Sequence, residues 1–192
     1  MAGRLSVLFF ATLVGLSCAG SSVRKSSDLR DFVLNEPMST TRLDALFALT
    51  KTLDLEETLW LIEQLTHTDP WVRSKAAMAL SDSKSPGAAS ALYLASLGEK
   101  DAFVYGCVLG SLGRMRQDGK ALLVRLLERR GPSPILLAAL AQSSRVKPKK
   151  TWRGGGYFVN DLQGQEWWQT TGRRELGDQV PDESKEAHPE GL

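Results

Sequence analysis

The sequence has few of the side chains from which catalytic and metal-binding sites are usually built. It contains two cysteines, Cys18 and Cys107, and two histidines, His67 and His188. Two cysteines are too few for the disulfide framework of a small secreted domain, and no cysteine–histidine spacing typical of zinc occurs. A glycine-rich phosphate loop and a serine nucleophile elbow are also absent. We therefore expect no catalytic residue, no metal site and no cofactor.

A large net charge is missing as well. Lys and Arg number 24, against 22 Asp and Glu, and this balance gives no indication of a nucleic-acid partner. The sequence has one long apolar run, close to its N-terminus. Arg4 precedes an unbroken apolar or small run over residues 5–16, which is too short for a permanent membrane span. This pattern resembles a secretory signal peptide and predicts export, so we assign residues 1–17 to the leader and 18–27 to a flexible tether.

The end of the leader allows two interpretations. Residues 15–18, Gly-Leu-Ser-Cys, resemble a bacterial lipoprotein cleavage site at which Cys18 becomes the acylated first residue, although such sites prefer leucine where this chain has its glycine. An ordinary signal peptidase site stays open, because Ser17 and Ala19 satisfy the small-x-small rule with cleavage before Gly20. The first interpretation predicts an outer-membrane lipoprotein that faces the periplasm. The second predicts a secreted or periplasmic protein without an anchor.

Residues 40–130 repeat three times with a period of about 31 to 32 residues. The aligned apolar positions lie on one stripe of an α-helix. In the second and third copies they pair Val72 with Val104, Ala76 with Val108, and Leu80 with Leu112; the first copy contributes Ala45, Ala48 and Leu49. A second apolar run follows each first one: Leu55, Leu59 and Ile62, then Ala88, Ala91, Leu92 and Ala95, then Leu122, Leu123, Leu126 and Leu127. Two helices per period predict stacked helical hairpins.

The pattern D-x-x-V-R-x-x-A-A-x-A-L of residues 69–80 resembles the first helix of a HEAT repeat, of the type also found in phycobilisome lyases. Tyr105 replaces the arginine in the third copy, and Met38 replaces the aspartate in the first. The resemblance covers about residues 40–130, with a half-repeat on each side, at 27–35 and 134–142. It implies an all-α fold, a short α-solenoid of three to four hairpins over residues 28–143. Its second helices would line a concave face that binds protein, and a lyase-like or cofactor-handling function is the alternative by analogy alone.

Composition changes after residue 143. Residues 144–176 are basic and aromatic and lose helical periodicity, so we expect an irregular segment with one hairpin arm at 157–164. Its tryptophans Trp152, Trp167 and Trp168 either cover the last helix pair, as terminal caps of solenoids do, or dock a partner. Residues 177–192 have almost no apolar side chains, and we expect this tail to be disordered.

These observations predict an exported, lipid-anchored adaptor that binds another protein of the bacterial cell envelope. The candidate partner contacts are Trp60, Arg125, Arg129, Trp152, Trp167 and Trp168. Cations gather in the third repeat, where they form either a solvated helix face or a site for an acidic partner or phosphate-bearing lipid: Arg114, Arg116, Lys120, Arg125, Arg129 and Arg130. We interpret Cys107 as a buried structural thiol, and His67 with Asp69 as part of a turn.

Overall fold

The computed structural model describes residues 27–37, 40–147 and 159–176. The chain divides into one compact unit that ends at Pro37 and a second that begins at Met38. In the first unit residues 27–35 form a helix, and the Asn35 amide donates to the Asp31 carboxylate one turn earlier at 2.7 Å. The predicted half-repeat at 27–35 is therefore helical. The leader, the tether, Cys18, Trp152 and the tail lie outside the described residues.

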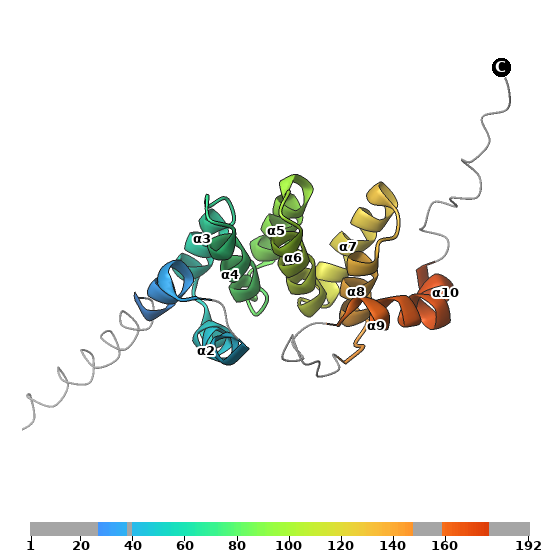
Figure 1. Cartoon of the computed structure of the whole chain (residues 1–192), viewed down its shortest axis with the longest axis horizontal. Helices are drawn as coiled ribbons and strands as arrows, with labels where there is room; N and C mark the ends of the chain where they lie inside the picture. The colour runs from blue at the N-terminus through green and yellow to red at the C-terminus, as the bar shows by residue number, and fades with distance from the viewer. Residues whose placement is uncertain (1–26, 38–39, 148–158, 177–192) are drawn as a thin grey trace, which may run out of the picture. The chain divides into compact units, whose positions relative to one another are not determined.

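The second unit is a stack of helical pairs (Figure 1). We call the first helix of each pair A and the second B. The A helices are α2 (Thr40–Leu49), α4 (Pro70–Leu80), α6 (Ala102–Arg114) and α8 (Pro134–Ser143). The B helices are α3 (Leu55–Gln64), α5 (Pro86–Gly98) and α7 (Gln117–Arg130), and a 3-10 turn, η1 (Thr50–Thr52), follows α2. The predicted three hairpins and the half-repeat at 134–142 are confirmed, and no described residue belongs to a strand.

Side-chain caps set the starts of α3, α4 and α6. The Asp69 carboxylate accepts from the Trp71 N–H at 2.8 Å, and proline follows Asp69 where the helix has no use for a donor. Asp101 repeats this role at the start of α6. Asp54 and Glu57 accept from each other's backbone N–H groups at 2.8 and 3.0 Å, which completes a capping box before α3. Each A helix of repeats two and three therefore begins at the aspartate that the repeat pattern contains.

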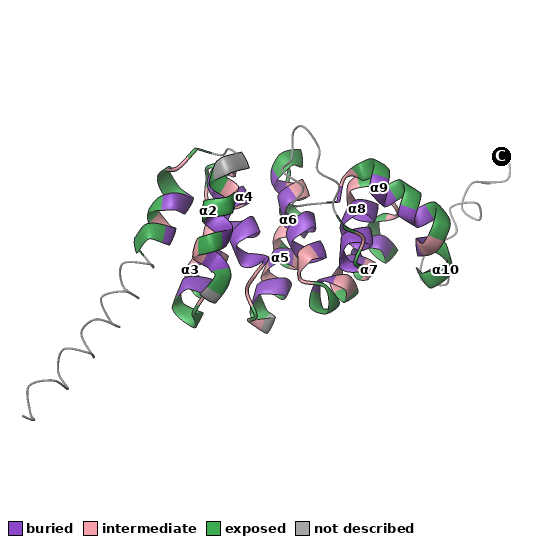
Figure 2. Ribbon diagram, turned by 90° about the horizontal axis from the view of Figure 1, so that it is seen from below, coloured by how far each residue is buried: buried purple, intermediate pink, exposed green. Residues whose placement is uncertain are grey.

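The core lies along the A helices, and α4 packs on α6 and α6 on α8. Figure 2 shows buried residues on each of these helices. The aligned positions of the second and third copies are almost completely buried, as the repeat predicts: Val72, Ala76, Ala77, Leu80, Val104, Val108, Leu109 and Leu112. The helix stripe read from these two copies is thus the packing face of the stack.

The first copy departs from the predicted register. Ala45 and Ala48 are exposed, and Leu46 and Phe47 are buried instead. Within this unit α2 is the first A helix, and its buried side carries Leu46 and Phe47. The alignment of Ala45 and Ala48 with the buried alanines of α4 was therefore wrong, although the helix itself was predicted.

The C-terminal segment is helical, which corrects the irregular segment and hairpin arm that the sequence predicted. Helix α9 (Asp161–Trp167) continues through a π-helical turn, η2 (Trp168–Gly172), into α10 (Arg173–Leu176). A Cβ at Gly164 would lie 2.3 Å from the Ala138 backbone nitrogen, so glycine allows α9 to approach α8 closely. The wider π turn brings the adjacent Trp167 and Trp168 and the later Leu176 to the buried side. Adjacent residues of an α-helix do not normally face the same side, so the buried pair Trp167 and Trp168 hides the helical period in the sequence.

This helical run caps the stack. Gln142 of α8 accepts from the Val159 N–H at 3.1 Å, and Gln163 donates to the Lys147 carbonyl at 3.0 Å. Trp167 and Trp168 are 7% and 6% exposed. Of the two interpretations, the structure supports the terminal cap for residues 159–176. Among the described residues no helix is both long and apolar enough to cross a membrane.

Candidate functional site

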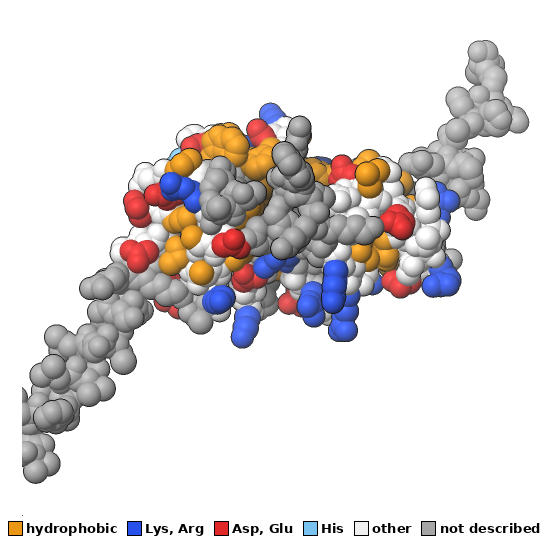
Figure 3. All heavy atoms as spheres, turned by 60° about the horizontal axis from the view of Figure 1, so that its bottom comes forward, with side chains coloured by type: hydrophobic (Ala, Val, Ile, Leu, Met, Phe, Trp, Pro, Cys, Tyr) orange, Lys and Arg blue, Asp and Glu red, His pale blue; other side chains and the backbone are white. Residues whose placement is uncertain are grey.

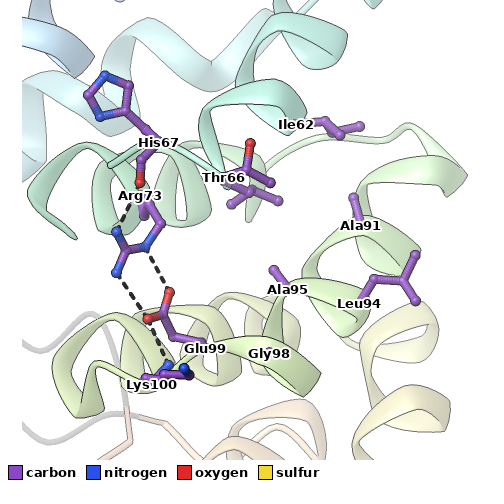
Figure 4. A pocket seen from close by; sticks show the side chains of 11 residues that line it. Ile62, Thr66, His67, Arg73, Ala91, Leu94, Ala95, Gly98, Glu99 and Lys100 are labelled. Carbon is purple, nitrogen blue, oxygen red and sulfur yellow. Dashed lines mark hydrogen bonds and ion pairs between the residues drawn. The ribbon is translucent and has the colours of Figure 1, made fainter. Parts of the chain in front are cut away.

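An open groove lies between the B helices α3 and α5, at the end where each B helix turns into the next A helix (Figure 4). Its volume is about 650 Å³. The floor is apolar and is contributed by both helices: Ile62, Leu65, Ala91, Leu94, Ala95 and Gly98. The rim is polar and comes from the two turns and α4: Thr66, His67, Arg73, Glu99 and Lys100. The groove therefore combines an apolar base with a charged edge.

Small side chains on α5 leave this space open. Ala91, Ala95 and Gly98 lie on one stripe of the helix, opposite Ile62 and Leu65 at the end of α3. A Cβ added at Gly98 would meet no atom within 4 Å. Because small side chains of α5 face larger ones of α3, these two B helices leave a gap here. A smaller groove of about 360 Å³ lies between the A helices α6 and α8, beside the start of the cap.

Exposed leucines occur on both B helices that form the groove, and Leu94 is the one in its lining. Leu94 is 66% exposed on α5, and Leu55 and Leu59 are 67% and 53% exposed on α3. The sequence analysis placed Leu55, Leu59 and Ile62 on the apolar run of α3, but the buried side of this helix carries Thr58, Leu61 and Leu65 instead. Apolar side chains on the water side of a surface helix indicate a second packing partner.

An ion pair fixes the polar edge. Arg73 donates to both carboxylate oxygens of Glu99, at 2.9 and 3.0 Å, and to the carbonyls of His67 and Thr68 at 2.9 and 3.1 Å. Glu99 also accepts from the backbone N–H groups of Lys100 and Asp101 at 3.0 and 2.9 Å. The hydrogen bond from Arg73 lowers the pKa of Glu99, and the same bond raises the pKa of Arg73. The edge is therefore charged and held rigidly in place.

His67 belongs to the turn, as predicted. Its ring Nδ1 accepts from the Asp69 N–H at 3.0 Å, and Asp69 then caps α4. No three or more His, Cys, Asp or Glu side chains converge on a possible metal position anywhere in the described ranges. The groove thus presents an apolar packing surface with a salt bridge at its edge.

The residues predicted to contact a partner are spread over the molecule. Trp60 lies on α3 and is half-buried, but it is not part of the groove lining. Arg125 and Arg129 are exposed on α7, one repeat further along. Trp167 and Trp168 pack in the cap, with their ring centroids 6.2 Å apart, so they are not part of an exposed surface. The predicted residues are therefore not brought together.

The six cations of the third repeat do not form one cluster either. Arg114 donates to Asp82 at 2.8 Å and its guanidinium lies 4.5 Å from the centre of the Phe47 ring. Lys120 lies 3.6 Å from Glu175 of the cap, and Arg130 stands over the Tyr105 ring and donates to the Leu97 carbonyl at 2.9 Å. Three of the six thus hold the fold together, while Arg116, Arg125 and Arg129 are exposed.

Leu94 and the Arg73–Glu99 pair were missed by the sequence reasoning. The sequence did contain an indication that Leu94 is exposed. Helix α5 is apolar on every side, so it has no polar face to turn towards solvent, and a surface helix of this kind must expose apolar side chains. No comparable signal existed for Glu99, because it lies in a turn 26 residues from Arg73.

Comparison with known proteins agrees with this geometry. Residues 26–104 match the HEAT-repeat family. The match covers the first two hairpins and the beginning of α6, and the helical pairing continues to α8. No curated protein and no solved structure shows significant similarity to the chain. Stacked repeats of this type are protein-interaction scaffolds, and their curved faces provide the binding surface.

Proposed function

We propose that this chain is an exported, lipid-anchored adaptor of the bacterial cell envelope and that it binds another envelope protein in the groove between α3 and α5. The observation that carries the proposal is the apolar groove with the exposed Leu94 in its lining, on repeats whose family binds proteins. Burying one leucine in an interface contributes about 1.5 to 3 kcal/mol, so Leu94 would supply one of several contacts that a stable complex needs.

The same B-helix surface indicates the character of the partner. By the burial pattern, Glu63, Leu94 and Arg125 occupy equivalent places on α3, α5 and α7, and all three are exposed. The surface therefore changes from acidic through apolar to basic along the stack. A partner segment with an apolar centre, a basic end over α3 and an acidic end over α7 complements it. This arrangement gives the predicted Arg125 and Arg129 a role in orientation.

The groove is tested by affinity purification from native membranes with Leu94→Glu. Because Leu94 is exposed, the variant should fold normally, and a buried carboxylate in the interface should lower partner recovery at least about tenfold. Leu162→Glu is the matched control, since Leu162 is 77% exposed but lies on the cap. Equal recovery with both variants would remove the groove from the binding surface.

The anchor is tested separately with Cys18→Ala. If Cys18 is acylated, the wild-type protein pellets with membranes and its N-terminal peptide carries the mass of the acyl chains. Loss of the thiol should release the chain into the soluble fraction. A wild-type chain that begins at Gly20 and is soluble would instead establish the secreted or periplasmic alternative.

A further inference from the structure

The smaller groove between α6 and α8 has no role in the function proposed above, and we call it the A-face groove. Its volume is about 360 Å³. The lining is mostly small and apolar, and it includes these residues of α6, α8 and the start of the cap: Phe103, Gly110, Ile135, Gln142, Val159 and Asp161. Asp161 is the one charged residue in this lining. The A-face groove therefore suits apolar side chains.

Contacts between the two helices give the A-face groove a direction. A Cβ at Gly106 would meet Ile135 at 2.9 Å, and one at Gly113 would meet the Ala139 carbonyl oxygen at 2.7 Å. These contacts advance in the same direction along α6 and α8, so the two helices are parallel. Their first turns therefore lie at one end of the groove. The Gln142 side chain lies towards the other end, where it accepts from the N–H of the first cap residue at 3.1 Å.

Two exposed aromatic rings extend the apolar surface at the first end. Trp71 of α4 and Phe103 of α6 are 51% and 50% exposed, and their ring centroids are 5.2 Å apart. Figure 2 shows α4, α6 and α8 in one row with α9 beside α8. Figure 3 shows apolar side chains at the surface along the upper part of the face that is turned forward. Half-exposed rings beside an apolar groove indicate that a further apolar group packs there.

Both ends of one stretch of this chain are fixed beside the A-face groove. Residues 148–158 join Lys147 to Val159, and the described ranges stop at these two residues. The Lys147 carbonyl accepts from the Gln163 side chain of α9 at 3.0 Å, and Val159 belongs to the groove lining. A segment attached this close to a site acts at an effective concentration of about millimolar, so a separate protein has to compete with it.

The composition of residues 148–158 matches the groove. They contain Trp152, Tyr157 and Phe158, with three cations and no acid. The other stretch that adjoins the cap, residues 177–192, has no aromatic side chain. The cations complement the single charge of the lining, Asp161, while the aromatic rings supply the larger apolar area. Residues 148–158 are therefore the occupant that the groove fits.

The segment is also long enough to follow the whole groove. The distance along α6 from Ala102 to Gly110, which both line the groove, is about 12 Å. Trp152 comes five residues after one fixed end and seven before the other, which allows about 17 Å and about 23 Å of extended chain. Trp152 is thus within reach of the exposed ring pair. Tyr157 is two residues before Val159, so in an extended chain both side chains face the same side.

We propose that residues 148–158 lie along the A-face groove of their own chain, with the Trp152 ring against Trp71 and Phe103 and with Tyr157 beside Val159. The segment then belongs to the terminal cap and covers apolar surface that the helices of the stack leave open. Trp152, one of the predicted partner contacts, thereby becomes part of the fold. The groove between α3 and α5 is left as the apolar groove that a partner can enter.

Photocrosslinking of the purified protein tests the position of the segment. An aromatic crosslinker, p-benzoylphenylalanine, replaces Trp152, and mass spectrometry identifies the peptides to which it attaches. We expect attachment to residues 70–80 or 102–110 at the mass of one chain. The same crosslinker in place of Arg173, which is exposed in the last helix of the cap, is the control and should not reach these peptides.

The other outcomes of this experiment contradict the proposal. Attachment to the B helices, or no attachment, would show that Trp152 does not lie in the A-face groove. A product with the mass of two chains would show that the segment of one copy occupies the groove of another. That result would overturn the assignment to the same chain.

The Cys107 thiol reports independently whether the groove is occupied. Its side chain lines the A-face groove and is 7% exposed, and it is the remaining thiol in the Cys18→Ala chain. Adding Trp152→Ser and Tyr157→Ser to that chain should speed maleimide labelling of the native protein at least about tenfold, because the thiol loses its cover.

A matched variant separates the aromatic side chains from the charges of the segment. Lys149→Gln with Lys150→Gln keeps all the rings, and the labelling rate should change by less than about twofold. Equal labelling rates in the serine and glutamine variants would overturn the proposal. Circular dichroism shows whether both variants fold, and the crosslink decides the proposal if the serine variant does not.

Neither measurement depends on the groove between α3 and α5. Leu94→Glu, which tests the proposed function, should leave both the crosslink and the labelling rate of Cys107 unchanged. Loss of the crosslink in the Leu94→Glu chain would show that the two grooves are not independent and would overturn the assignment of the segment to the A face alone.

Discussion

The second and third repeats occupy equivalent places in one stack but are stabilised differently at matching positions. In the second repeat Arg73 of α4 reaches Glu99 through two hydrogen bonds. Tyr105 holds the matching place on α6, and the Arg130 guanidinium lies 5.6 Å from its ring centre. The third repeat has no arginine at position 105, and Arg130, on the other helix of the same hairpin, supplies the cation instead. The contact between A helix and turn is retained, but a cation–π contact is weaker than a charged hydrogen bond.

Burial has the same consequence for two different side chains. Lys75 and Cys107 are 32 residues apart in the repeat and both are buried. Burial lowers the pKa of Lys75, and it raises the pKa of Cys107 to about 12. In both cases the neutral form is favoured, because a charge loses its hydration inside the stack. The two matching positions are therefore equally buried, and the repeat accommodates a lysine at one and a cysteine at the other.

The two repeats also differ in how closely their helices approach. Ala88 of α5 and Gly119 of α7 hold matching buried places. A Cβ at Gly119 would lie 1.8 Å from the Leu112 carbonyl oxygen, so α6 and α7 are in closer contact than α4 and α5. The third repeat therefore depends on close packing, whereas the second depends on its ion pair.

The largest effect is expected from Gly119→Ala. The added methyl group cannot fit beside the Leu112 backbone without moving α7, and overpacking of this kind costs about 3 kcal/mol in the free energy of unfolding. Urea denaturation measures the loss. Gly98→Ala is the control, because its methyl group meets no atom within 4 Å and should change stability by less than about 0.5 kcal/mol. Similar losses in the two variants would show that α6 and α7 are not in such close contact.

A smaller difference should separate Arg73→Met from Tyr105→Leu. Arg73→Met leaves the partly buried Glu99 carboxylate without its cation and should lower the free energy of unfolding by about 2 kcal/mol. Tyr105→Leu removes a cation–π contact worth about 0.5 to 1 kcal/mol. Urea denaturation of both variants provides the comparison. Equal losses would contradict the assignment of the ion pair as the stronger of the two contacts.

The pH dependence of the ion pair follows from Glu99. Its pKa lies below the ordinary value of 4.5 in the folded chain, chiefly because Arg73 donates to it. The stabilisation is therefore complete above the unfolded pKa and is lost as pH falls through the lower, folded value. The stability difference between wild type and Glu99→Gln should be constant near neutral pH and shrink below pH 4.5. A difference that stays constant in acid would exclude ionised Glu99 as its source.

The repeated positions of the fold could be predicted, because each helix that packs on two neighbours must present the same stripe. Val72 and Val104 illustrate this, and Asp69 and Asp101 add cap signals that depend on local chemistry alone. The end of the stack could not be predicted in this way. At Ala45 the aligned position is exposed, and the buried stripe lies on Leu46 and Phe47 instead. At Gly164 the reason for a glycine is the backbone of α8, which the local sequence does not contain.

The candidate groove was less predictable than the helices that build it. Leu59 and Leu94 are apolar and helical, and a sequence pattern cannot tell whether such a residue faces the core or an absent partner. Contacts between repeats are equally hidden from the local sequence. Asp82 accepts from Thr50 and from Arg114, each 32 residues away. Sequence periodicity therefore predicts the helices, and long-range contacts decide which surfaces they expose.

The smallest effect on stability, and the closest test of the matching environments, comes from thiol labelling. In the Cys18→Ala chain Cys107 is the remaining thiol, since the sequence has 2 cysteines. With its pKa raised from 9.0 to about 12 and its side chain buried, maleimide labelling at about pH 8 should be at least about a hundredfold slower in native protein than in urea. Moving the thiol by Lys75→Cys with Cys107→Ala should give the same protection. Fast labelling at position 75 would show that the second repeat opens where the third stays closed, and the two sites would no longer be equivalent.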